Sequence, residues 1–398
     1  MIFPEKMVDL GKNRSVIREL FEYGNKRKTE IGKDNVFDFS LGNPSVDPPK
    51  CVNESIIKLL TEKSNIELHG YTSAPGDFEV RTSIAEYINK SFGTALSTDN
   101  IYMTVGAAAS LTISLNAICK PGNEVITFAP FFPEYRVFVE NAGANLVVCP
   151  LVGKNFDVDF DMFEKSINKN TRAVIINSPN NPSGVVLSEE TIKKISDILQ
   201  IKEKEYKEPI YIIADEPYRE LTYGAKVPYI MNYYDDTIVC YSFSKSLSLP
   251  GERLGYIAVC NKAKYEKDLF AAICGAGRAL GFVCAPSLFQ RVCAMCLGKT
   301  SDISVYKTNR DLLYNSLTKF GFECVHPDGA FYLFMKSPIA DANEFSEFAK
   351  KYELLLVPSD SFGMPGYVRI SYCVDTDMIK HSLSAFEKLA KDFSLIGE

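Results

Sequence analysis

The sequence predicts an α/β protein: a mostly parallel seven-stranded sheet sandwiched by helices, followed by a smaller α+β domain. Seven short apolar runs between residues 101 and 259 alternate with stretches of helical periodicity, the pattern of a parallel sheet covered on both faces. Beyond about residue 285, a helical stretch precedes separated strands at 331–335, 354–357 and 367–372. We therefore expect an N-terminal segment (1–45) that joins the small domain, a large domain (46–285) and a small C-terminal domain (286–398).

Composition excludes several classes of function. With 44 basic and 50 acidic residues, the chain carries a net charge of -6, which argues against nonspecific binding to nucleic acid or to an anionic membrane. No run approaches the roughly 20 apolar residues of a membrane span, and the first residues lack the basic-then-apolar pattern of a secretory signal. We expect a cytoplasmic protein.

The cysteines indicate a reduced protein rather than a disulfide framework. Their number, 11, is odd, and several lie in apolar runs, as Cys149 and Cys240 do. Cys293 and Cys296 have the spacing of a redox motif, but they lie in a helical stretch without a second pair that could complete a zinc site. The three histidines are dispersed along the sequence. We predict no metal site.

Two loops precede the predicted sheet. The first contains Gly42, Asn43 and Pro44, residues that end regular structure, although such a turn is also common outside functional sites. The second contains Tyr71 and leads to Gly76, after which apolar positions recur on one face of a predicted helix. Tyr71 can equally be an ordinary aromatic residue of a loop.

The first strand of the sheet (101–105) leads into a glycine turn and a helix that continues to residue 118. Gly106, Ala107 and Ala108 occupy this turn. A glycine turn at a helix N-terminus presents free backbone N–H groups to an anion, and the helix dipole adds to their attraction. The turn therefore predicts a phosphate site made by the backbone.

Polar or aromatic residues follow the next strands where each of them ends. Phe132 follows the strand at 124–128, Asn181 follows the strand at 173–177, and Asp215 and Tyr218 follow the strand at 210–214. Ligands of parallel sheets gather at the carboxyl ends of the strands, so we expect the turn that holds Asn181 to lie on the functional edge of the sheet. The alternative for Phe132 is a place in the hydrophobic core.

The most informative stretch follows the strand at 237–241. It contains Ser242, Ser244, Lys245 and Arg253, and a further apolar strand (255–259) comes directly after. A lysine amine forms a Schiff base with an aldehyde cofactor, while hydroxyls and a guanidinium are the donors that a phosphate group needs. A lone lysine is usually a surface residue. This combination instead predicts pyridoxal 5'-phosphate as the cofactor.

The order of three motifs adds a family resemblance. They are Asn180-Asn181-Pro182-Ser183-Gly184, Asp215-Glu216-Pro217-Tyr218 and the stretch around Lys245. Together they resemble the fold-type I pyridoxal-phosphate enzymes, specifically the aspartate-aminotransferase-like (class I/II) family, and the resemblance covers nearly the whole chain.

This resemblance implies roles around the cofactor. It implies that Phe132 stacks on the pyridine ring, that Asp215 keeps the pyridine nitrogen protonated, and that Asn181 and Tyr218 donate to the phenolic oxygen. Tyr71 matches the tyrosine that reaches the cofactor phosphate of the other subunit. A homodimer with shared active sites follows from this match.

The resemblance also assigns the substrate side of the site. Lys245 is the Schiff-base lysine and the base that moves the substrate α-proton, and Arg369 binds the substrate α-carboxylate through a bidentate pair. Gly42 and Asn43 match a turn that lines the substrate pocket. Arg278 is a candidate for a second substrate arginine by position only. The plain alternative for Arg369 is an arginine on the surface of a strand.

The resulting hypothesis is an aminotransferase that moves an amino group between an L-amino acid and a 2-oxo acid. The same residues fit carbon–sulfur β-lyases of the family, because both chemistries share an intermediate. A non-catalytic regulatory protein that binds the cofactor is a further alternative, but it could dispense with Lys245 or Arg369, and both are present. The sequence leaves the amino acid and the oxo acid open.

Overall fold

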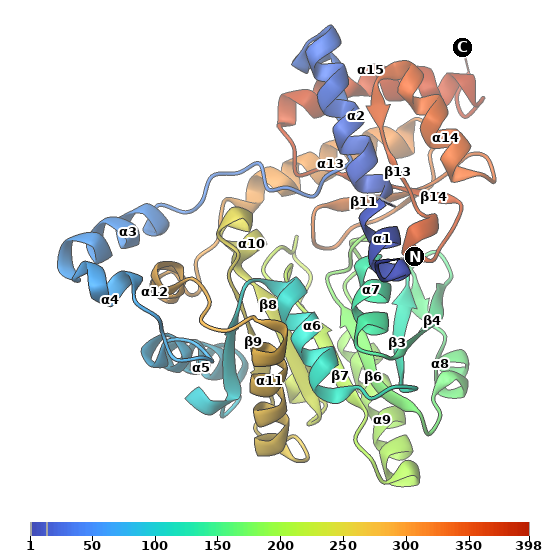
Figure 1. Cartoon of the computed structure of the whole chain (residues 1–398). Coiled ribbons are helices and arrows are strands. Elements are labelled where there is room, and N and C mark those ends of the chain that lie inside the picture. Colours follow the sequence, from blue (N-terminus) through green and yellow to red (C-terminus); the bar gives the residue numbers. More distant parts are fainter. Residues whose placement is uncertain (1, 13–14, 398) are drawn as a thin grey trace.

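The computed structural model describes residues 2–12 and 15–397 of the chain (Figure 1), so residues 1, 13, 14 and 398 of the predicted terminal segments lie outside it. Its centre is an eight-stranded sheet in the order β2-β9-β8-β7-β6-β3-β4-β5. The strands are β2 (Ile101–Thr104), β3 (Glu124–Ala129), β4 (Asn145–Val152), β5 (Asp157–Val158), β6 (Thr171–Asn177), β7 (Tyr211–Asp215), β8 (Thr237–Ser242) and β9 (Gly255–Val259).

The sheet is mainly parallel, as predicted. Strands β4, β3, β6, β7 and β8 run parallel to one another, whereas β9 pairs antiparallel with both β8 and β2. All seven predicted strands are present. The eighth, β5, pairs antiparallel with the end of β4 and is too short, at two residues, to give a periodic signal in the sequence.

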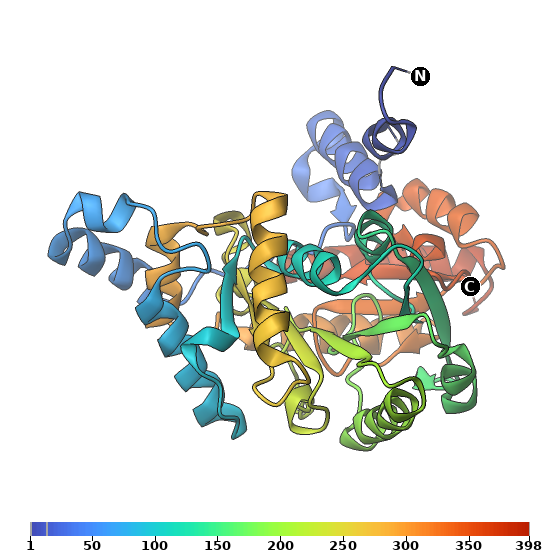
Figure 2. The ribbon, with the colours of Figure 1, turned by 60° about the horizontal axis from the view of Figure 1, so that its bottom comes forward.

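Helices cover both faces of this sheet (Figure 2), which explains why its central strands are buried along their whole length and consist mostly of apolar residues. Helices α6 and α11 pack against each other and against β9, and α7 packs against α6 and β4. The opposite face is covered by α9, which also contacts α8. These helices are α6 (Ala107–Ile118), α7 (Glu134–Asn141), α8 (Phe160–Ser166), α9 (Glu189–Tyr206) and α11 (Glu266–Leu280).

A group of helices extends from the β2 edge of the sheet, at the left of Figure 1. They are α3 (Cys51–Glu62), α4 (Asn65–His69), α5 (Phe78–Phe92) and α12 (Ser287–Met295). α12 packs against all three others, although it follows residue 285 in the chain. Its buried Val292 and Cys293 belong to the same hydrophobic cluster as the large sheet.

A smaller antiparallel sheet in the order β10-β11-β14-β13 contributes to a second hydrophobic cluster. Leu20, Val357 and Phe362 form a third, small cluster beside it. A two-stranded parallel pair, β1 with β12, lies beside the small sheet and connects the N-terminal segment to this part of the chain. The strands are β1 (Phe37–Asp38), β10 (Cys324–Val325), β11 (Tyr332–Lys336), β12 (Leu354–Leu355), β13 (Val357–Pro358) and β14 (Tyr367–Ser371). The helices are α1 (Glu5–Lys12), α2 (Val16–Ile31), α13 (Ile303–Lys319), α14 (Ala342–Ala349) and α15 (Thr376–Asp392).

Three further findings concern the described residues as a whole. No helix within residues 2–12 and 15–397 is long and apolar enough to cross a membrane. Within the same residues, no group of three or more His, Cys, Asp or Glu side chains is placed to hold a metal ion. All 11 cysteines are unpaired.

Candidate active site

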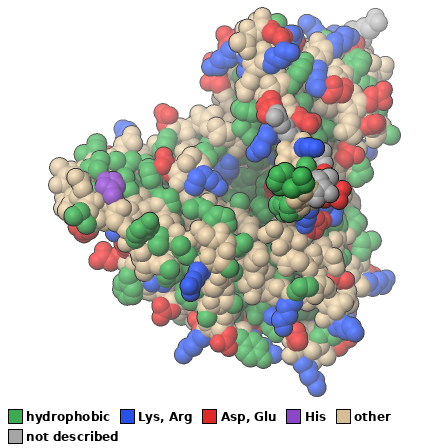
Figure 3. Space-filling model, viewed as in Figure 1, with side chains coloured by type: hydrophobic (Ala, Val, Ile, Leu, Met, Phe, Trp, Pro, Cys, Tyr) green, Lys and Arg blue, Asp and Glu red, His purple; other side chains and the backbone are tan. Residues whose placement is uncertain are grey.

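A cavity of about 290 Å³ opens at the carboxyl ends of β6, β7 and β8, beside the N-terminus of α6 and below the small sheet. Figure 3 shows a hollow on this face between the upper and lower parts of the molecule. The cavity is lined by Ile17, Leu41, Gly42, Ala107, Ala108, Leu111, Phe132, Asn177, Asn181, Asp215, Pro217, Tyr218, Ser242, Ser244, Lys245, Pro250, Arg253, Tyr332 and Arg369.

Most of the residues singled out in the sequence lie in this lining. They are Gly42, Ala107, Ala108, Phe132, Asn181, Asp215, Tyr218, Ser242, Ser244, Lys245, Arg253 and Arg369. Gly106 lies just behind it, where an added Cβ would stand 2.8 Å from Arg253 Nη2. Asn43 is exposed outside the cavity, and Tyr71 is 97% exposed on the loop between α4 and α5.

Lys245 lies on a four-residue helix, α10 (Phe243–Ser246), that begins directly after β8. The Ser242 hydroxyl caps this helix by accepting from the backbone N–H of Ser244. Lys245 Nζ donates to the carbonyl oxygen of Gly42 at 2.7 Å. Burial lowers the pKa of Lys245 to about 8, and the cations of Arg253 and Arg369 add to this effect. About a tenth of the amine is therefore neutral at pH 7, far more than for an ordinary lysine.

Asp215 ends β7 and is fully enclosed by protein. Its Oδ2 accepts from the Tyr135 hydroxyl at 2.5 Å, and its backbone carbonyl accepts from Asn177 Nδ2 at 2.9 Å. Its Oδ1 is buried without a hydrogen-bond partner. Burial raises the pKa of Asp215 to about 7, opposed by the bond from Tyr135. A buried carboxylate oxygen without a donor is suited to a ligand that brings a cationic N–H group.

An anion-binding end lies at the opposite side of the cavity from the small sheet. It consists of the first backbone N–H groups of α6, the hydroxyls of Ser242 and Ser244, which are 2.8 Å apart, and Arg253. Arg253 is exposed, and its Nη1 donates to the carbonyl of Pro250. Among the residues that the structure describes, no carboxylate pairs with Arg253, so its guanidinium is available to an anion.

Arg369 lies at the small-sheet side of the cavity, on β14, and is only 2% exposed. Its Nη1 donates to Asn181 Oδ1 at 3.3 Å and its Nη2 to the carbonyl of Ser40 at 2.5 Å, while Nε has no partner. No carboxylate in residues 2–12 and 15–397 pairs with it. A buried guanidinium without a counter-charge is suited to a carboxylate ligand, because charges inside proteins are normally paired.

Sequence reasoning missed several residues of the site. Tyr135 and Asn177 hold Asp215 in place, and Tyr332 contacts both Tyr218 and Arg369. Asn177 gave a usable signal, because a polar residue at the end of an apolar strand points to the ligand edge of the sheet. Tyr332 gave none, since it begins a strand that reads as core.

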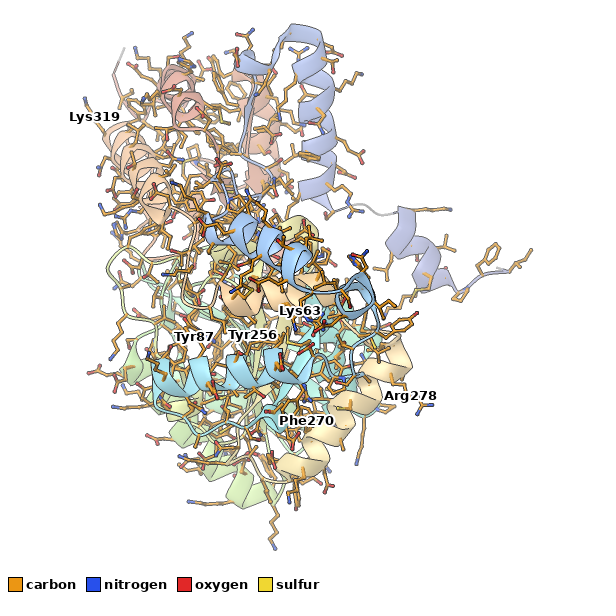
Figure 4. All side chains as sticks on the ribbon, turned by 90° about the vertical axis from the view of Figure 1, so that its left-hand side faces the viewer. Lys63, Tyr87, Tyr256, Phe270, Arg278 and Lys319 are labelled. Carbon is orange, nitrogen blue, oxygen red and sulfur yellow. The ribbon has the colours of Figure 1, made fainter. Side chains whose placement is uncertain are left out.

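Arg278 lies on α11, outside the cavity of its own chain. It is exposed, and Figure 4 shows it at the outer edge of that helix, pointing away from the body of the molecule. Glu216, the residue next to Asp215, is buried elsewhere and pairs with Arg219. Only Asp215 of the two carboxylates therefore faces the site.

Comparison with known proteins gives matches along almost the whole chain. The family model for aminotransferase class I and II matches residues 34–386. An aspartate aminotransferase of Pyrococcus horikoshii is 30% identical over 94% of each chain. Aromatic-amino-acid aminotransferase 2 of Thermococcus litoralis is 28% identical over 96% of this chain and 97% of its own.

Solved structures agree with these relatives. An aminotransferase from Eubacterium rectale is 58% identical, with a TM-score of 0.97 over 99% of both chains. An aspartate aminotransferase from Thermotoga maritima is 28% identical, with a TM-score of 0.86 over 97% of this chain and 99% of its own. The predicted fold class and family are thus confirmed. The chain is an aminotransferase and belongs to the class I and II family of these enzymes.

Proposed function

We propose that this aminotransferase binds pyridoxal 5'-phosphate through Lys245 and uses it to move an amino group between an L-amino acid and a 2-oxo acid. The observation that carries the proposal is the unpartnered Oδ1 of Asp215 in the same cavity as Lys245. A pyridinium N–H would supply the donor that this buried oxygen lacks. When bound, the cofactor supplies an aldehyde that carries the amine and a ring that withdraws electrons from the substrate.

In this proposal the anion-binding end of the cavity holds the cofactor phosphate. Backbone N–H groups from Gly106 to Ala108, the hydroxyls of Ser242 and Ser244, and the guanidinium of Arg253 are its donors. Support comes from Arg253, which no described carboxylate neutralises. Gly106 has a φ of 95°, and its lack of a side chain leaves space for the guanidinium.

The ring of the cofactor is held by the residues at the carboxyl ends of the parallel strands. We assign the ring face to Phe132, the pyridine nitrogen to Asp215, and the phenolic oxygen to Asn181 and Tyr218. An ionised Asp215 favours a protonated nitrogen, and a protonated ring accepts electrons more readily. The raised pKa of Asp215, about 7, falls again when a cation pairs with it.

On the substrate side, Arg369 binds the α-carboxylate, with Gly42 and Asn43 in the adjoining turn. As a free, neutral amine, Lys245 would take the proton from the substrate α-carbon. Its lowered pKa supports this role, because a base must be neutral to accept a proton. Ile17 and Leu41 add apolar side chains to the lining of the same cavity.

The proposal includes a homodimer with shared active sites. Apolar side chains are exposed on the neighbouring elements α3, α4, α5 and α12 and their loops: Ile57, Leu60, Ile66, Tyr71, Phe78, Val283 and Met295. Such a group of exposed apolar residues is typical of a protein interface. Tyr71 lies outside the cavity of its own chain, and we assign it to the cofactor phosphate of the partner. Arg278 remains a candidate for a second substrate arginine in the partner's site.

We also propose a two-domain organisation and a cytoplasmic location. The two larger hydrophobic clusters support separate domains, with the N-terminal segment joined to the small one through β1 and β12. The packing of α12 on α3 and α5 favours a boundary between residues 296 and 302 rather than at 285. The 11 unpaired cysteines support a reducing compartment.

An absorbance titration tests the proposed function. Protein loaded with pyridoxal phosphate is mixed with single amino acids, including aspartate and the aromatic amino acids for which the relatives are named. We expect one donor to bleach the visible band of the cofactor and a 2-oxo acid to restore it. Release of pyruvate and ammonia from cysteine-like substrates without an oxo acid would instead establish a β-lyase.

A further inference from the structure

Tyr332 lies at the centre of the site, yet neither the motifs nor the roles above include it. It begins β11 and is 3% exposed. In the antiparallel pairing of β11 with β14, Tyr332 lies opposite Ser371 and Phe334 lies opposite Arg369, so all four side chains share one face. The guanidinium carbon of Arg369 lies 4.7 Å from the centre of the Tyr332 ring. The face of the Tyr332 ring therefore packs against the Arg369 guanidinium in a cation–π contact.

The hydroxyl of Tyr332 touches two other parts of the site. It lies 2.9 Å from the hydroxyl of Tyr218, with the two rings edge to face at 5.7 Å. It also lies against the backbone of Gly42, where an added Cβ would stand 2.1 Å from it. The carbonyl of Gly42 in turn accepts from Lys245 Nζ. The Tyr332 side chain thus contacts Arg369, which is assigned to the substrate carboxylate, and Tyr218, which is assigned to the phenolic oxygen of the cofactor. It also contacts Gly42, whose carbonyl accepts from Lys245.

The direction of the bond between the two phenols decides what Tyr218 can do. Burial raises the pKa of Tyr332 to about 12 and that of Tyr218 well above its usual value, so both hydroxyls stay protonated near neutral pH. If Tyr332 donates to Tyr218, the proton of Tyr218 is free to bind an acceptor in the cavity. If Tyr218 donates to Tyr332, no proton of Tyr218 remains for the cavity.

One observation and one general property of hydrogen-bond chains favour donation by Tyr332. The cation of Arg369 over its ring withdraws electron density, which makes a phenol a stronger donor. An acceptor in the cavity then extends the chain from Tyr332 through Tyr218, and hydrogen bonds in such chains strengthen one another.

We propose that Tyr332 is a positioning residue: its hydroxyl donates to Tyr218 and thereby directs the Tyr218 proton to the phenolic oxygen of the cofactor, while its ring supports Arg369. The inference rests on the proposed function, because it needs the cofactor in the cavity. It also explains the glycine at position 42, since any side chain there would displace the Tyr332 hydroxyl.

The test compares Tyr332→Phe with a matched control, Tyr372→Phe. Tyr372 is also buried and its hydroxyl also bonds another tyrosine, Tyr223, at 3.3 Å, but neither of these two lines the cavity. The readout is the pH midpoint of the visible absorbance of protein loaded with pyridoxal phosphate. We expect Tyr332→Phe to raise this midpoint by about 0.3 pH units, from the modest strengthening per bond in a hydrogen-bond chain.

The direction of the midpoint shift follows from the charge on the phenolic oxygen of the cofactor. Weaker donation leaves more negative charge on the phenolic oxygen, which holds the proton on the neighbouring nitrogen more tightly. We further expect kcat to fall roughly 3- to 10-fold, with KM for the amino acid within about twofold, because the ring under Arg369 is retained. In a Tyr218→Phe background, Tyr332→Phe should cause no additional shift of the midpoint.

The outcomes separate this inference from the proposed function. If wild-type protein with pyridoxal phosphate shows no pH-dependent band, the proposed function fails. If the wild type shows the band but Tyr332→Phe shifts it no more than Tyr372→Phe, only the role of Tyr332 is overturned; an undiminished shift in the Tyr218→Phe background overturns it as well. The added methyl group of Gly42→Ala would displace the Tyr332 hydroxyl, so this variant should also raise the pH midpoint of the visible absorbance. An unchanged midpoint in Gly42→Ala contradicts the inference.

Discussion

The lowered pKa of Lys245 predicts a large and selective reactivity of its amine in cofactor-free protein. With a pKa of about 8 instead of 10.5, about 9% of the amine is neutral at pH 7 rather than about 0.03%, a roughly 300-fold increase. The cause is removal of the ammonium from water, assisted by the cations of Arg253 and Arg369. Only the neutral amine attacks an aldehyde. The rate of attack should therefore rise with pH and level off above about pH 8.

The assay adds a slight excess of pyridoxal phosphate, traps the product with borohydride at pH values from 6 to 10, and locates it by peptide mass spectrometry. Lys63, exposed on the side of the molecule shown in Figure 4, is an internal comparison, because its hydrogen bond to Glu67 raises rather than lowers its pKa. Lys245→Arg is the matched control and should give no adduct at that position. A midpoint near 10.5, or a dominant adduct on another lysine, would refute the reasoning.

Four further predictions concern Asp215, Arg369 and the proposed dimer. Asp215→Ala should slow deuterium exchange at the substrate α-carbon about 10²- to 10³-fold while weakening cofactor binding less, and near-normal exchange would contradict its role. In cofactor-free protein the pKa of Asp215 is about 7, against 3.8 for an unperturbed aspartate, so the free energy of unfolding should fall by about 4 kcal/mol as the pH rises from about 4 to about 7. Urea unfolding of Asp215→Asn should lack this fall. Arg369→Lys should raise KM for amino acids about 10- to 100-fold, since lysine lacks the planar fork, and an unchanged KM would place the carboxylate elsewhere. Mixed Tyr71→Phe and Lys245→Ala protomers should differ in activity from the sum of the two separate proteins if Tyr71 crosses subunits, and exact additivity would show independent sites.

The sequence was a good guide wherever a residue's role depends on its place relative to a strand end. Lys245, Asp215 and Asn181 each follow an apolar strand, and a parallel sheet brings such ends to one edge whatever lies between them. The same logic brought Phe132 and Ser242 to the cavity. Topology alone was sufficient for these residues.

The sequence was a poor guide where a contact depends on packing between segments that are far apart in the chain. Tyr332 reaches Tyr218 only because the small sheet lies over the end of the large one, and its sequence neighbours look like any buried strand. The packing of α12 on α3 and α5 could not be foreseen for a related reason: its side chains, and not its helical periodicity, decide which helices it contacts. Strand β5 is too short to register in any periodic pattern.

The pairing of β1 with β12 has a consequence for how the protein is made. Phe37 lies beside Leu354, so the ribosome must synthesise nearly the whole chain before the two can meet. At about 5–20 residues per second, this takes roughly 15 to 60 seconds after Phe37 is made. All strands of the large sheet precede residue 260 and can assemble during that interval. Arg369, on the last strand, is among the last residues to emerge. The nascent protein therefore completes the sheet that carries Lys245 before it acquires the arginine assigned to the substrate.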